Sequence, residues 1–136
     1  MMTISEILKR KSFFYCEEGA SAEQITKAEN ALGLEFADEY KEYIQLFGSV
    51  SCGGHELTGV SKDERLDVVE VTRRNRMKHP DIPHDLYVIE ETHIDGIVIW
   101  QVNSGEICYT EENDIPIKVY KSFSEYASTF EDAEEE

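Results

Sequence analysis

The chain has 136 residues, 40% of them hydrophobic and 10% aromatic, which is enough for one globular domain with a buried core. Thirteen Lys and Arg residues face 29 Asp and Glu residues, and the resulting net charge of −16 argues against binding to phosphate-rich nucleic acid. No apolar run approaches the ~20 residues that span a bilayer, and "MMTISEILKRKSFF" lacks the features of a signal peptide, so we expect a cytoplasmic protein.

The N-terminal half has the apolar spacing of helices. Thr3-Ile-Ser-Glu6 and Ser21-Ala-Glu-Gln24 are capping-box patterns, which predict helices over about 3–11 and 21–32. A third helix is predicted to start near Ala37 or Asp38 and to end at Gly48, because its apolar residues fall at i, i+3, i+4 and i+7. "DERLDVVEVTRRNRM" predicts a fourth helix over about 64–77, before a proline-rich loop.

From residue 86 the pattern changes to that of β-strands. "LYVIE", "IVIWQV", "EICYT" and "IPIKVY" are rich in β-branched and aromatic residues and are separated by turn residues. A final capping-box pattern at Ser122 predicts a closing helix. The predicted fold class is therefore α+β, with N-terminal helices, a central antiparallel meander sheet and a closing C-terminal helix in one domain over 1–130. The acidic tail, 131–136, is expected to extend into solvent.

The order of these elements, from about Ser21 to Phe130, resembles that of the SUKH superfamily. "ADEYKEYIQLFGS" is similar to the Leu-Pro-x-x-Tyr-x-x-(hydrophobic)-x-x-x-Gly helix of that family, with Tyr40, Ile44 and Gly48 in register. The sequence departs from the family pattern at Ala37, where a proline is usual. It also departs in "GSVSCGG", which replaces the more usual Asn-Gly-Gly after the helix.

The resemblance implies binding rather than catalysis. Bacterial members of the superfamily are typically immunity proteins that neutralise a cognate polymorphic toxin, often a nuclease, and the fungal relatives include a cell-wall-synthesis regulator. We therefore expect a non-enzymatic immunity protein, without cofactor or metal, that covers the basic active site of a toxin. An acidic chain suits this role because opposite charges speed association. The alternative is a regulatory or scaffold module that docks onto a cellular protein.

Two further sequence features leave chemical alternatives open. Cys52-Gly-Gly-His55 has the spacing of half a zinc site or of a Cys/His nucleophile, or it is a glycine-rich turn with a buried cysteine. The odd number of cysteines, three, at wide spacing favours reduced thiols over a disulfide framework. The basic cluster "RRNRMKH", 73–79, either contacts phosphate, complements the end of its helix, or pairs with acids of the same chain.

Carboxylates are concentrated in the predicted strand-end turns, where they should be solvated. They act in general acid–base chemistry, form an acidic rim that faces a partner, or are plain surface charge. Among the strand aromatics, some must belong to the core while one or two can anchor an interface. The residues expected to contact the partner are Glu90, Glu91, Asp95, Trp100, Glu111, Glu112 and Asp114.

Overall fold

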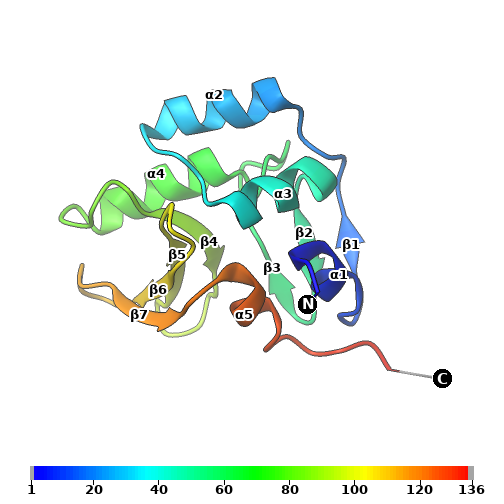
Figure 1. Ribbon diagram of the computed structural model, residues 1–136. Coiled ribbons are helices and arrows are strands. Elements are labelled where there is room, and N and C mark those ends of the chain that lie inside the picture. Colours follow the sequence, from blue (N-terminus) through cyan, green and yellow to red (C-terminus); the bar gives the residue numbers. More distant parts are fainter. Residues whose placement is uncertain (1, 135–136) are drawn as a thin grey trace.

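The computed structural model describes residues 2–134 and confirms the α+β class (Figure 1). The helices are α1 (Ile4–Lys9), α2 (Ala22–Leu32), α3 (Asp38–Phe47), α4 (Val68–Lys78) and α5 (Phe123–Ala127). The strands are β1 (Tyr15–Cys16), β2 (Val50–Cys52), β3 (His55–Glu56), β4 (Tyr87–Glu91), β5 (Val98–Gln101), β6 (Ile107–Thr110) and β7 (Ile117–Tyr120). Within residues 2–134, no helix is long and apolar enough to cross a membrane.

The helix ends follow the predicted capping chemistry. Complete capping boxes start α1 at Thr3 and α2 at Ser21, and at α5 the Ser122 hydroxyl accepts a hydrogen bond from the Glu125 backbone. The helix α4 starts four residues later than the predicted residue 64. The preceding residues bridge to Gly59 instead, whose N–H donates to the Leu66 carbonyl and whose carbonyl accepts from Val68. Pairing with a distant segment therefore replaces the first predicted turn.

The structure contains a small second sheet. The sequence pattern indicates short-strand or turn character in "SVSC" and strand alternation in "HELTGV", but not their pairing or the third strand. The strand order of this sheet is β1-β2-β3, and all neighbours are antiparallel. The turn between β2 and β3 consists of Gly53 and Gly54, both at positive φ, so it needs glycine-like freedom. The strand β1 has only two residues and exists because Tyr15 pairs with Ser51 and Cys16 with Val50. A strand that short has no local signature.

The larger sheet is the predicted meander, with strand order β4-β5-β6-β7 (Figure 1). The helix α4 covers one face at β4 and β5, where Val71 packs in a core cluster with Val88 and Trp100. The helices α3 and α5 cover the opposite face, in a larger cluster that includes Ile89 and Ile99. The meander therefore lies between two helical layers, with its loops at the two ends of the strands.

The start of the acidic tail, 131–134, is exposed as expected, but its backbone is tied to the chain after α1. The Glu131 carbonyl accepts from the Ser12 backbone, and Ala133 donates to the Arg10 carbonyl. The Nζ of Lys11 lies 2.7 Å from an Asp132 carboxylate oxygen, and the lysine is only 6% exposed. Asp132 thus neutralises a cation that the fold buries. The last two residues of the predicted tail, 135–136, lie outside the described residues.

Candidate protein-interaction surface

The four-stranded sheet brings most of the predicted contact residues to one end. In an antiparallel meander, the β4–β5 turn and the β6–β7 loop lie at the same end, and Val98 at the start of β5 pairs with Thr110 at the end of β6. Asp95 is in the turn, and Glu111 and Glu112 open the loop. All three are exposed. We call Asp95, Glu111 and Glu112 the acidic end of the sheet.

Trp100 is fully buried and is therefore not available as an interface anchor. It sits in the middle of β5, and its indole Nε1 donates a 2.9 Å hydrogen bond to the hydroxyl of Thr110. A buried Trp needs a partner of this kind for its N–H. Its position in the small core cluster corrects the expectation that it contacts a partner, because a strand pattern alone does not tell which face is covered.

Glu90 is also withdrawn from the surface, although the sequence placed it among solvated carboxylates. The β4–β5 pairing passes from Val88↔Trp100 to Glu90↔Ile99, so Ile89 is an extra, bulged residue. The bulge turns Glu90 toward the face that α5 covers. There it is 5% exposed, lies 2.9 Å from the Nδ1 of His55 and accepts a hydrogen bond from the hydroxyl of Tyr126.

Glu90, His55 and Tyr126 form a largely buried polar group in which Glu90 contacts both of the other side chains. Burial, reinforced by the Glu90 charge, raises the pKa of Tyr126 above its usual range. The ring of His55 stacks on Phe130, with centroids 3.7 Å apart. His55 thus anchors α5 and the chain after it to the small sheet, which is a structural role.

Glu91 and Asp114 are engaged by the basic segment around α4. Glu91 accepts hydrogen bonds from Arg74 at 3.2 Å and from Asn75 at 2.9 Å, and Asp114 lies 3.0 Å from the Nδ1 of buried His79. These pairs tie α4 to the strand ends. Of the three alternatives for the basic cluster, the structure therefore supports pairing with acids of the same chain.

Other members of the basic cluster hydrogen-bond to carbonyl oxygens. Arg73 donates to the Ala31 carbonyl near the end of α2, and Arg76 donates to the carbonyls of Leu32 and His84. Burial lowers the pKa of Arg76, and its Nε is buried without a hydrogen-bond partner among the described residues. These guanidinium groups complement the C-terminal end of α2 and hold the 79–86 segment.

Cys52 lies in an environment that disfavours a reactive thiolate. It is the cross-strand partner of His55 in the β2–β3 hairpin and is 2% exposed, while the Nδ1 of His55 lies 2.9 Å from Glu90. Burial raises the pKa of the Cys52 thiol to about 11, which opposes the thiolate that a nucleophile or a metal ligand requires. Across residues 2–134, no group of three His, Cys, Asp or Glu side chains is placed to hold a metal ion.

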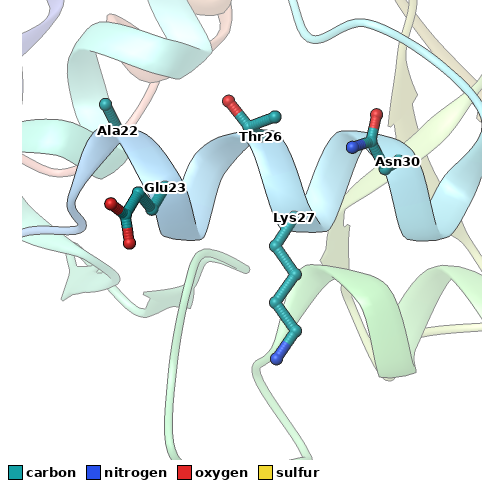
Figure 2. A pocket seen from close by; sticks show the side chains of 5 residues that line it. All are labelled: Ala22, Glu23, Thr26, Lys27 and Asn30. Carbon is teal, nitrogen blue, oxygen red and sulfur yellow. The ribbon is translucent and has the colours of Figure 1, made fainter.

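A shallow hollow lies along α2 (Figure 2). All its lining residues come from that single helix, and Figure 2 shows Ala22, Thr26 and Asn30 along one side of it. Its volume is about 460 Å³, but a single helix provides no opposing wall. A ligand would be left mostly in water, so the hollow does not have the enclosure that small-molecule sites need.

One exposed feature was not singled out from the sequence. Three β-branched residues at and before β7 are exposed: Ile115, Ile117 and Val119 are 67%, 49% and 41% exposed. In the sequence they look like the inward positions of an ordinary strand. Only the strand order shows that β7 is the last strand, directly after the loop that carries Glu111 and Glu112. The acidic end of the sheet therefore adjoins an apolar edge.

Comparison with known families agrees with the fold. The SUKH_5 family model, described as SMI1-KNR4 cell-wall, matches residues 2–131 and thus nearly the whole chain. No curated protein matches the chain.

Proposed function

The chain belongs to the SUKH_5 family, and from that premise we propose that it is an immunity protein that binds and neutralises a cognate bacterial toxin in the cytoplasm. The SUKH superfamily includes immunity proteins as well as regulatory members, and its members act mainly by binding other proteins. The proposed partner is a basic toxin domain, most simply a nuclease. Neutralisation is by occlusion: the chain covers the basic cleft where the toxin binds phosphate.

The observation that carries the proposal is the acidic surface. The net charge of −16 arises from 29 acidic against 13 basic residues, and Asp95, Glu111 and Glu112 are exposed at the same end of the sheet. The excess of 29 acidic over 13 basic residues means that the surface keeps a negative field even though some acids, such as Glu91, pair with bases such as Arg74. A basic cleft is attracted to such a surface and its association is accelerated.

The same features support a mechanism without catalysis. The thiol of Cys52, one member of the pair that resembled a reactive site, is buried, and burial raises its pKa, which disfavours the thiolate. Occlusion needs only shape and charge complementarity, and the exposed carboxylates at the acidic end of the sheet supply the charge.

The experiment is co-expression with the products of neighbouring open reading frames. If the proposal is right, one such product stops growth, this chain restores it, and the two proteins co-purify. If no neighbouring product is toxic or bound, the immunity function is excluded. The alternative, a regulatory or scaffold module, is then favoured, since the matching family model carries a cell-wall description.

A further inference from the structure

The two outer strands of the larger sheet, β4 and β7, differ in how their outward backbone groups are hydrogen-bonded. At β4, the Thr58 backbone donates to the Ile89 carbonyl at 2.8 Å and the Thr58 hydroxyl donates to the Val88 carbonyl at 2.7 Å. The Thr72 hydroxyl accepts from the Val88 N–H at 3.0 Å. The polar groups of this edge are therefore satisfied by neighbouring residues, which protects the strand from further pairing.

The other outer strand, β7, has a strand neighbour on one side only. It pairs with β6, and no strand among residues 2–134 pairs with its outer side. Figure 1 shows β7 at the outer margin of the sheet, with α5 following it. An outer strand that stays uncovered presents backbone N–H and C=O groups to which an extended peptide can add as a further strand.

The side chains of β7 suit such an addition. Ile115, Ile117 and Val119 are at least 41% exposed and alternate along the chain with Pro116 and Lys118. Natural outer strands usually avoid a row of exposed β-branched residues, because it promotes pairing with other chains. An apolar row retained at this position is what a strand-accepting surface requires, since pockets and side chains there give specificity.

The charge around β7 decides what kind of partner fits. The loop that leads into β7 begins with Glu111 and Glu112, and Asp95 lies in the β4–β5 turn at the same end of the sheet. A second copy of the chain, also at −16, is repelled. Lys118 on the strand is engaged by Glu106, so its charge is already paired within the sheet. A basic segment would instead be attracted by Asp95, Glu111 and Glu112.

We propose that β7 is a docking strand: its outer edge accepts an extended segment of a partner protein, with β-branched residues that pack on Ile117 and Val119 and Lys or Arg residues that face Glu111 and Glu112. The inference deepens the proposed function and rests on it only for the partner's identity as a toxin. The exposed edge of β7 and the acidic residues near it indicate which residues the docking segment should contain. This expectation does not depend on the activity of the rest of the partner.

The test uses the full chain and a phage-displayed library of random peptides of about 10 residues, the length of a long strand. Enriched peptides are synthesised, and amide hydrogen exchange of the chain is measured by NMR with and without them. We expect enrichment of alternating β-branched and basic residues, and slowed exchange concentrated in β7. Enrichment of acidic or non-alternating peptides, or slowed exchange on another element, overturns the proposal.

Matched variants make the test specific. The double variant Ile117→Thr/Val119→Thr keeps β-branched residues and should weaken binding of the selected peptides about tenfold or more. Leu46→Gln, which removes a side chain of similar exposure, 52%, from α3, should leave binding unchanged. A peptide with proline at its centre should fail to bind, because it lacks a ladder donor. Equal binding of that peptide, or equal loss in both variants, contradicts strand addition.

Two outcomes separate this inference from the proposed function. If selected peptides bind β7 but no neighbouring gene product is toxic, the docking strand stands and the immunity function fails. If a toxin is neutralised while the β7 double variant protects equally well, the function stands and the docking strand fails. Sedimentation of the chain alone should show a monomer at high concentration. A dimer whose contacts map to β7 would replace the basic partner by a second copy.

Discussion

Glu90 lies 2.9 Å from the Nδ1 of His55, a contact that joins the large sheet to the small one across 35 positions of sequence. The carboxylate is buried and also accepts from Tyr126 of α5. Three parts of the fold, the two sheets and the closing helix, thus meet at one side chain. The contact is structural, because it ties the β2–β3 hairpin to β4 and to α5.

Replacing Glu90 by alanine should destabilise the fold by about 3 kcal/mol or more, because His55 and Tyr126 lose a buried partner and a cavity forms. Chemical denaturation of the purified variant measures the change. Replacing the neighbouring Glu91, which is less buried and bonds Arg74, should cost less, about 1 kcal/mol. Equal losses in the two variants would contradict the central role of the Glu90 contact.

Substitution of Gly59 should destabilise the protein, because its Cα lies close to the Gly48 backbone. A Cβ built on Gly59 would lie 1.8 Å from the Gly48 carbonyl oxygen, so Gly59→Ala should destabilise the protein by about 3 kcal/mol or prevent folding. The control is Gly54→Ala in the β2–β3 turn, where φ is +83 and nothing lies within 4 Å of the added carbon. That variant should lose only about 1 kcal/mol through backbone strain. Thermal unfolding followed by circular dichroism distinguishes the two.

Stability should fall in alkaline solution, beginning near pH 9. Burial raises the pKa of Cys52 and of Cys108 from 9.0 to about 11, so both thiols stay protonated in the folded state after the unfolded chain has begun to ionise. A group with a raised folded pKa contributes stability below its unfolded pKa and loses it as pH rises toward the folded value. The decline should therefore span about pH 9 to 11, extended by the buried tyrosines Tyr40 and Tyr126, whose pKa values are also raised.

Urea unfolding at several pH values measures this decline, and Cys52→Ala/Cys108→Ala should make it shallower between pH 9 and 10. Thiol labelling gives an independent check. At pH 8 both cysteines should react much more slowly in the native protein than in the denatured one, because the thiolate is scarce and Cys52 is buried. Rapid native labelling of Cys52 would contradict its inert role and reopen a nucleophile there.

Much of the fold was predictable because its signals are local. The capping patterns at Thr3 and Ser21 and the alternating strands after residue 86 were confirmed, since each depends on residues a few positions apart. The failures share a different cause. The strand β1, the late start of α4 and the anchored tail all depend on hydrogen bonds between distant segments, as between Ser12 and Glu131. Local spacing carries no information about these partners.

The exposure of the expected contact residues was predicted correctly only where it depends on local sequence. Turn positions correctly indicated the exposed carboxylates Asp95, Glu111 and Glu112, because turns face solvent. Glu90 and Trp100 were misplaced, because their burial depends on a bulge and on which face α4 covers. The exposure of Ile117 and Val119 on β7 was not predicted, because the sequence of one strand does not show its position in the sheet.

The acidic end of the sheet should control the rate at which a basic partner associates. The triple variant Asp95→Asn/Glu111→Gln/Glu112→Gln should slow association with the toxin severalfold and weaken its salt dependence, while folding stays unchanged. A matched control, Glu18→Gln/Glu23→Gln/Glu42→Gln, removes three exposed carboxylates from other parts of the chain. Stopped-flow or surface-based kinetics from ~50 to 500 mM salt would test this. Equal effects of both triple variants would mean that net charge, not this surface, directs the encounter.

The proposed immunity function requires that the chain inactivate a basic toxin by covering its active site. The activity of the purified toxin domain, identified by the co-expression experiment, should therefore be measured as increasing amounts of the purified chain are added. Activity should fall linearly and disappear at equimolar chain, and the toxin should be intact after the complex is dissociated. Full toxin activity in the presence of excess bound chain would contradict occlusion, as would covalent change of the toxin.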